Sequence, residues 1–168
     1  MLYDWTNVQF AKVLNNLSAI LDKASAYADS KKFDVNVLLE SRLAPDQFNF
    51  IRQVQIACDT AKFCPARLTG KEAPAFEDSE KTVAELKTRI AKTITFLQSF
   101  HAEELQNKES VRITQPRWQG KSLSGAEYVS QHVVPNFYFH VTTAYAILRH
   151  NGVDVGKADY LGALPYRT

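Results

Sequence analysis

Four polar residues lie on stretches that are otherwise apolar at helical spacing, where a side chain would be shielded from water. The clearest is His140. At about 100° per residue, it shares one side of its helix with the apolar or small residues Val133, Phe137, Ala144 and Ile147, whereas Arg149 points the opposite way. We therefore predict that His140 is buried, either as a general base or as a structural histidine bonded to a carbonyl or another side chain. Asn136, one turn earlier, lies at the edge of the same side.

The other two candidates are Gln55 and Asp59, on an earlier stretch. They are four residues apart, so their side chains project together from one helix. Paired with His140, Asp59 would orient the imidazole and raise its pKa, as a catalytic base requires. The same part of the helix also carries charged and large apolar residues, namely Phe48, Arg52, Ile56, Lys62 and Phe63. Alternating charges are typical of a solvated face, but the apolar members indicate a pocket wall or a subunit interface.

No strong metal or nucleophile motif accompanies these residues. The spacings His-x3-His, Glu-x-x-His and HExxH do not occur, and the six glycines form no phosphate loop. Cys58 and Cys64 lie roughly 9 Å apart along one helix at about 1.5 Å per residue, beyond the ~7 Å that a disulfide allows. We expect both thiols to stay reduced. His101 and His132 are predicted to be surface residues.

Four amphipathic patterns predict the helices that position the candidates. The first covers about 4–29 with Val8 and Ala11 opening its inner face, the second 45–68, the third begins near residue 79, and the last covers 124–149. Prolines at 65 and 135 should kink or end their helices. Alternation over 111–114 and 121–123 predicts a short β-hairpin between the third and fourth helices. We therefore predict an all-α four-helix bundle with this hairpin, as one domain over 1–168 with a short tail after Gly152.

The composition excludes several classes of partner. The 168 residues fit one domain, and 20 Lys and Arg against 18 Asp and Glu leave a net charge of +2. Nucleic-acid and anionic-membrane partners require a clustered basic excess, which this chain lacks. No run approaches the ~18 apolar residues that cross a bilayer, and the first residues carry no export signal. We expect a cytoplasmic protein with neither nucleic acid nor membrane as a partner.

Two segments carry a resemblance to a known family. Residues 135–153, PNFYFHVTTAYAILRHNGV, resemble the last helix of the bacterial-type DinB/YfiT-like superfamily. Residues 50–62, FIRQVQIACDTAK, are similar to the second helix of one subgroup known only as a domain of unknown function. The resemblance covers nearly the whole chain. It implies a DinB-like four-helix bundle, often a homodimer, whose better-studied relatives bind a divalent metal through three histidines. Some of those relatives are thiol-dependent transferases that join a low-molecular-weight thiol to a small electrophile.

Carried over residue by residue, the resemblance implies a degenerate metal site. It puts His140 on the third metal histidine and Asn136 on the second, and it puts the first near Gln55 or Asp59. One retained imidazole is a poor ligand set for Zn or Ni, because imidazole supplies most of the affinity for these metals. We therefore predict no resident cofactor. The expected site is a small pocket with His140 and Asp59 as catalytic residues and Gln55 and Asn136 lining it.

Three functions stay open on these grounds. The first is a thiol-dependent transferase-like enzyme that acts on an unknown small molecule. The second is a non-enzymatic dimeric bundle in which the same residues form a buried hydrogen-bond network. The third is a surviving metal site in which water fills the lost positions. We also expect a homodimer formed through Phe48, Ile56 and Phe63; the competing possibility is that these residues face the pocket.

Overall fold

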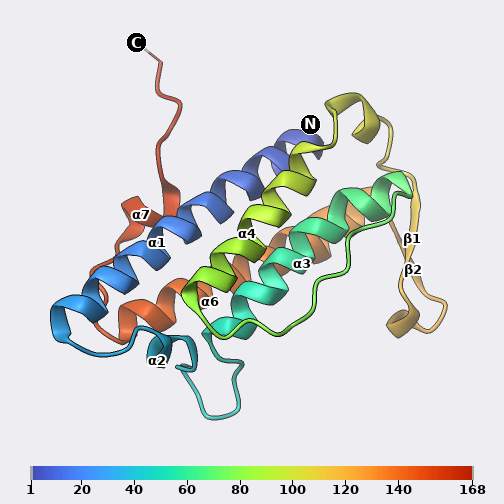
Figure 1. The fold of residues 1–168 in the computed structure, drawn as a ribbon. Helices are drawn as coiled ribbons and strands as arrows, with labels where there is room; N and C mark the ends of the chain where they lie inside the picture. The colour runs from blue at the N-terminus through green and yellow to red at the C-terminus, as the bar shows by residue number, and fades with distance from the viewer. Residues whose placement is uncertain (1, 168) are drawn as a thin grey trace.

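The structure is a computed structural model that describes residues 2–167. It is mostly helical with one small two-stranded antiparallel sheet, as predicted. Its long helices are α1 (Gln9–Lys31), α3 (Phe50–Thr69), α4 (Val83–Gln98) and α6 (Val134–His150). The short ones are α2 (Asn36–Leu39), α5 (Gly125–Glu127) and α7 (Lys157–Leu161). In Figure 1 the long helices run alongside one another, with α1 against α4 and α3 between α4 and α6. None of the described helices is long and apolar enough to cross a membrane.

A hairpin follows α4 at one end of these helices (Figure 1). Strand β1 (Arg112–Thr114) pairs antiparallel with β2 (Ser122–Ser124), and Ile113 lies opposite Leu123. The Ile113 side chain is buried in the core, whereas its neighbours in the strand are exposed, which explains the alternating sequence. The connection holds a short 3-10 helix, Pro116–Trp118, and turns at Gly120, whose φ of +83° favours glycine.

The start of α3 differs from the prediction, whereas its end lies within one residue of the predicted Leu68. The helix begins at Phe50 and not near residue 45, because the Asn49 side chain caps it by accepting a hydrogen bond from the Arg52 amide at 3.0 Å. Pro65 does not end the helix, which continues to Thr69 before Gly70 adopts the left-handed conformation. The proline ring is buried, so packing against the core compensates for the lost backbone hydrogen bond.

The predicted fourth helix consists of three consecutive helical pieces. Ser124 and Glu127 form the expected capping box at its start. Next come a π-helical turn, Tyr128–Val133, and α6, which has Pro135 in its first turn. A π turn lets the chain accommodate a proline that cannot donate a backbone hydrogen bond. It also changes the rotation per residue, so a 100° projection does not hold across residues 128–133.

Two further expectations about the chain ends are wrong. Val8 is 50% exposed because it lies in a second π-helical segment, Asp4–Val8, which shifts the apolar pattern; Asn7 is buried instead and donates to the Leu97 carbonyl at 2.9 Å. The residues after Gly152 are also more than a tail, since they include α7. This helix packs on α1, where the Asn16 side chain donates to the Tyr160 carbonyl at 3.0 Å.

Candidate functional site

His140 is bound to a residue that the sequence did not indicate. It is 7% exposed, and Val133, Ala144 and Ile147 are fully buried while Arg149 is exposed, which confirms the predicted orientation of α6. Its Nδ1 lies 2.7 Å from Oε1 of Gln53 on α3, and Gln53 in turn donates to the Phe48 carbonyl. Burial, with a smaller contribution from Arg52, lowers the pKa of His140 to about 4. The predicted pairing of His140 with Asp59 is wrong, because Asp59 pairs with Arg89 and Lys62 instead.

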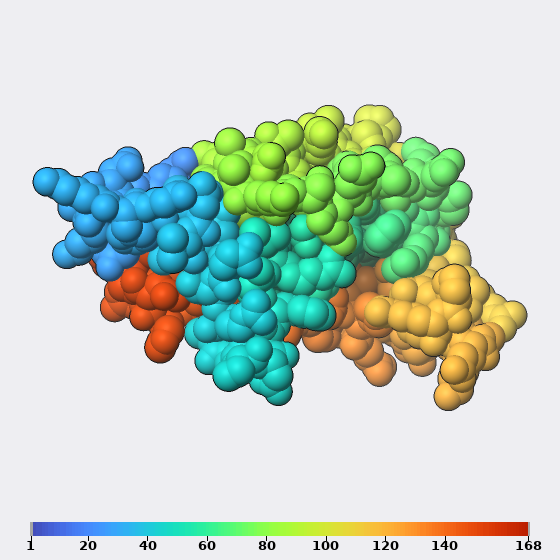
Figure 2. All heavy atoms as spheres, turned by 60° about the horizontal axis from the view of Figure 1, so that its bottom comes forward, coloured from blue at the N-terminus to red at the C-terminus, as the bar shows by residue number. Residues whose placement is uncertain are grey.

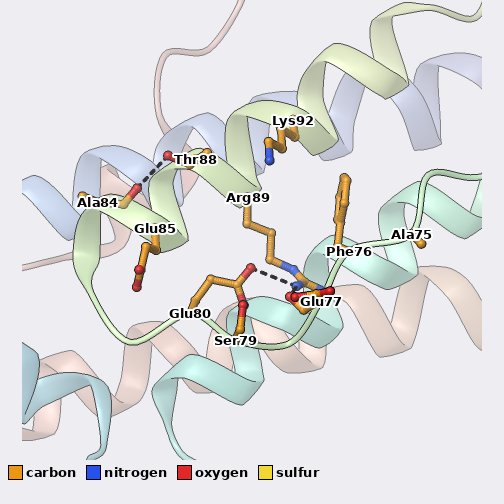
Figure 3. A pocket seen from close by; sticks show the side chains of 10 residues that line it. All are labelled: Ala75, Phe76, Glu77, Ser79, Glu80, Ala84, Glu85, Thr88, Arg89 and Lys92. Carbon is orange, nitrogen blue, oxygen red and sulfur yellow. Dashed lines mark hydrogen bonds and ion pairs between the residues drawn. The ribbon is translucent and has the colours of Figure 1, made fainter.

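Asp59 belongs instead to a charge network centred on Arg89 of α4, whose side chain is 1% exposed. Arg89 Nη2 lies 2.9 Å from Asp59 Oδ1 and 3.0 Å from Asp78 Oδ1. Its Nη1 donates to Glu80 Oε1 at 3.0 Å and to the Glu77 carbonyl at 3.1 Å. Figure 3 shows the guanidinium reaching from α4 towards the segment that carries Glu77 and Glu80.

Gln55 and two further cations extend this network along α3. Gln55 donates to Glu80 Oε2 at 2.9 Å and accepts from Arg52 Nη1 at 3.1 Å. Lys62 Nζ, on a side chain 2% exposed, lies 3.0 Å from Asp59 Oδ1. We call this set the Arg89 network; its charged members are Arg52, Lys62, Arg89, Asp59, Asp78 and Glu80. Three cations face three anions, so Gln55 and Asp59 are engaged in a balanced structural cluster.

A cavity of about 500 Å³ opens beside the network, between α4 and residues 75–80 (Figure 3). Its lining includes Arg89 and Glu80, which already pair with each other. It also includes Glu85, whose carboxylate accepts the backbone amides of Lys81 and Thr82 at the start of α4. These backbone hydrogen bonds lower the pKa of Glu85. Three of the charged groups that line this cavity, Arg89, Glu80 and Glu85, are therefore engaged in contacts within the chain.

A second hollow, of about 400 Å³, lies between the outer side of α3, the start of α6 and the hairpin. We call it the α3–α6 groove; Figure 2 shows α3 (teal), the hairpin (gold) and the start of α6 (orange) meeting on one face. Its lining includes Phe48, Ile56 and Phe63. Of the two roles predicted for these residues, this placement favours the wall of a pocket over a subunit interface. Asn136 lines it too and donates to Thr60 Oγ1 at 2.7 Å.

The hairpin end of the groove holds two arginines, a tyrosine and a histidine. Arg67 donates to the buried Tyr128 hydroxyl at 2.9 Å and lies over the Phe63 ring. Arg117 Nη2 lies 2.9 Å from His132 Nε2, and the His132 ring is 5.6 Å from that of Tyr128. A guanidinium can only donate, so Nε2 accepts and His132 is neutral. Burial, then Arg117 and Arg67, lowers the pKa of His132 accordingly.

Polar groups at this end have no partner among the described residues. Gln115 is 6% exposed, and its Nε2 is buried without a hydrogen bond. Nδ1 of His132 is buried and unpartnered as well. Neither Arg67 nor Arg117 forms an ion pair within residues 2–167. Buried polar atoms in folded proteins are nearly always satisfied, so these two donors are available to a water molecule or a ligand in the groove.

Sequence reasoning missed Arg67, Gln115, Arg117 and His132, all of which line the groove. His132 was assigned to the surface by a 100° projection that the π turn invalidates. The hairpin residues Gln115 and Arg117 reach α3 only through the tertiary fold. A usable signal was the four-residue spacing of His132 and Asn136, which both line the groove.

The residues at the implied metal positions do not fit a transition metal. His140 Nδ1 is bonded to Gln53, Asn136 to Thr60, and Asp59 to two cations. Within residues 2–167 no three side chains of the His, Cys, Asp or Glu type converge on one point. A ligand set of one imidazole with carboxylates and amides would bind zinc or nickel poorly.

The two cysteines are free, as expected from their spacing, and both are buried. Burial raises the pKa of Cys58 and of Cys64 to about 12 each. Because the thiolate is the nucleophile and metal ligand, neither side chain is a reactive group in the folded protein.

Comparisons with known proteins agree with one another. Residues 2–161 match the family described as domain of unknown function DUF1993. A crystal structure of a DinB family member protein from Shewanella denitrificans is 61% identical in sequence, with a TM-score of 0.97. The alignment covers 100% of this chain and 96% of that one. No curated protein matches the chain. The two matches confirm the resemblance drawn from residues 50–62 and 135–153.

Proposed function

This chain belongs to the DUF1993 family, and from that starting point we propose that it is a DinB-type four-helix bundle that binds a small organic molecule in the α3–α6 groove. The hairpin between α4 and α6 would close one end of the site. The observation that carries the proposal is the buried, unpartnered carboxamide nitrogen of Gln115 in the groove wall. Leaving such a donor without a partner costs roughly 1–3 kcal/mol, which a ligand acceptor would remove.

The proposal includes a degenerate metal site without a resident zinc or nickel. The positions that the resemblance implies for metal ligands carry His140, Asn136 and either Gln55 or Asp59, and each of these is engaged with another side chain. Elemental analysis of protein purified without a histidine tag should give well under one zinc or nickel per chain. Stoichiometric metal that disappears in His140→Ala would contradict this part of the proposal.

The alternative function, a structural hydrogen-bond network, is supported by the contacts of the two predicted site residues on α3. Gln55 and Asp59 lie in the balanced Arg89 network. We therefore assign these two residues to stability and the groove to binding, with Asn136 as a lining residue. His140 is assigned to stability through Gln53.

Self-association is a second proposal, supported by exposed aromatic residues beside the groove. Phe48 is 55% exposed and Phe139 of α6 is 57% exposed. Covering both with a second copy of the chain would bury apolar area that one copy leaves in water. Light scattering at micromolar protein should give the mass of a dimer. A monomer under these conditions would refute the dimer, and a dimer left intact by Phe63→Glu would place its interface elsewhere.

Ligand binding is tested with a library of neutral and charged organic fragments, followed by NMR on isotope-labelled protein. We expect some fragments at millimolar concentration to shift the signals of Gln115, Thr60 and Asn136. Replacing Ile56 by Trp should fill the groove and abolish these shifts. Val37→Trp is the matched control, since Val37 is exposed on α2 and does not line the groove. A library without any fragment that shifts groove signals would refute the proposal.

If the protein is an enzyme, the reaction that we propose is transferase-like: the groove would bind a small electrophile, and a low-molecular-weight thiol would be joined to it. Fragments that bind are incubated with a low-molecular-weight thiol, and protein-dependent thiol consumption would extend binding to catalysis. A cytoplasmic location and the absence of nucleic-acid partners stay predictions from composition.

A further inference from the structure

The two ends of the α3–α6 groove differ in how their charges are paired. Near its middle, Arg52 pairs with Asp78, and Asp59 pairs with Arg89 and Lys62. At the hairpin end the lining contains Arg67 and Arg117, and neither has a carboxylate partner within residues 2–167. The groove therefore carries two uncompensated positive charges at one end.

These two guanidiniums are positioned by neutral groups that leave most of their N–H groups free. Arg67 uses Nη1 for the Tyr128 hydroxyl, and Arg117 uses Nη2 for His132. Each guanidinium has five N–H donors in a planar fork, which matches the two oxygens of a carboxylate. Gln115 adds a buried carboxamide donor without a partner. All of these groups donate, so the ligand group they fit is an acceptor with negative charge.

The rest of the groove wall is apolar and aromatic. Ile56 and Phe63 are half-buried on α3, and the Arg67 guanidinium lies 4.6 Å from the centre of the Phe63 ring. A bare inorganic anion would leave this surface in water, whereas a flat apolar body attached to the anionic group would cover it.

We propose that the hairpin end of the groove binds the carboxylate of a small aromatic acid through Arg67, Arg117 and Gln115, with the aromatic body against Ile56 and Phe63. This inference rests on the proposed function, because it names the class of ligand that the same groove takes. His132 orients Arg117 and is a positioning residue in this arrangement.

The test uses Trp118, whose ring lies 5.6 Å from that of His132, as a local reporter. The chain has two tryptophans, so Trp5→Phe leaves Trp118 with the single indole N–H signal in the NMR spectrum. Phenylacetate is titrated against phenylacetamide, its neutral counterpart of nearly the same shape. We expect phenylacetate to shift the indole signal with an affinity at least fivefold higher, and to weaken when salt is raised from about 50 to 300 mM.

Three substitutions in the Trp5→Phe background assign the donors. Arg67→Gln and Arg117→Gln should each weaken phenylacetate binding at least fivefold while the affinity for phenylacetamide stays constant. Gln115→Leu should weaken the binding of both ligands, because its carboxamide donates to an amide carbonyl as well as to a carboxylate. Arg149→Gln is the matched control, since it removes one positive charge from an exposed position on α6 and should leave both affinities unchanged. A thermal melt of each variant checks that it is folded.

The outcomes separate this inference from the function on which it rests. Equal affinities for phenylacetate and phenylacetamide overturn the anion site and leave small-molecule binding in place. Phenylacetate binding that survives both arginine substitutions also overturns it. Failure of phenylacetate to shift the indole signal, while neutral fragments shift Thr60 and Asn136, overturns the inference alone. Failure of every fragment and of phenylacetate overturns both.

Discussion

Two arginine-rich regions lie on either side of α3 and differ in how their charges are satisfied. Arg89, on the α4 side, is 1% exposed and bonded to three carboxylates and one carbonyl. Arg67 and Arg117, on the α6 side, bond a hydroxyl and an imidazole. Asp59 stands between the regions, since it lines the groove but pairs with Arg89.

The contrast shows how the same residue type serves stability in one place and recognition in another. Removing a charge from water is expensive, so a buried guanidinium is stable only when anions surround it. Arg89 has these anions within the chain, and they engage both terminal nitrogens of its guanidinium, although its buried Nε has no hydrogen-bond partner among the described residues. Arg117 is exposed and keeps its charge in water, so folding does not require an anion beside it. That leaves its donors free for a ligand.

The largest expected effect comes from Arg89→Met. The variant keeps most of the side-chain volume but leaves Glu80 without its cation and Asp59 with Lys62 as its remaining cation. Breaking a buried ion pair from one side destabilises proteins by about 3–5 kcal/mol, and we expect urea unfolding to show a loss of this size. Arg149→Met, at an exposed position, should change stability by less than about 1 kcal/mol. Equal effects of the two variants would erase the distinction between the two regions.

His140→Ala is expected to cost roughly 1–3 kcal/mol, because it leaves the carboxamide oxygen of Gln53 buried without its partner. A double-mutant cycle with Gln53→Leu isolates the pair. The double variant should lose less than the sum of the single variants, since each single change already breaks the same hydrogen bond. Additive losses would show that the two side chains act independently.

The stability should also depend on the protonation of His140. Its folded pKa of about 4 lies below the ordinary histidine value of ~6.5, so the unfolded chain binds more protons between these two pH values. Stability therefore falls as the pH drops through this window and levels off below about pH 4. From pH 7 to pH 5 we expect a loss of about 1–2 kcal/mol from this group.

The matched variant for this pH effect is His140→Gln, which cannot titrate. Its unfolding free energy should fall less than that of the natural protein between pH 7 and pH 5, by the amount that His140 contributes. Identical pH profiles for the two proteins would contradict this prediction. They would show that His140 binds the same number of protons in the folded and in the unfolded chain.

The smallest expected effect belongs to Arg117→Met. Arg117 is exposed and forms no ion pair with the described residues, so its removal should change stability by no more than about 0.5 kcal/mol. A loss as large as that of Arg89→Met in urea unfolding would mean that Arg117 is a structural residue, and the comparison between the two regions would then fail.

Much of the fold follows from local patterns in the sequence. Apolar spacing predicts the four long helices, alternation predicts the strands, and Ser124 with Glu127 predicts a cap, because each pattern depends on residues within a few positions of one another. The burial of His140 was predictable for the same reason, as its neighbours on one helix face are all apolar. Helix starts were less predictable, since the cap at Asn49 competes with Pro45 for the start of α3.

The partners of the polar residues were decided by the tertiary structure. Spacing along α3 places Gln55 and Asp59 on one side, but it does not say that Arg89 of α4 lies opposite them. Likewise, the sequence identifies His140 without identifying Gln53. Gln115 also follows the end of α3 at Thr69 by 46 positions, so local spacing does not connect it with α3. The side chain that a polar residue contacts on another helix depends on the rotation and the shift of the two helices against each other. The packing of the whole core sets this rotation and this shift. The π turn at 128–133 adds a local rotation that brings His132 to the groove, so the groove exists only in the folded chain.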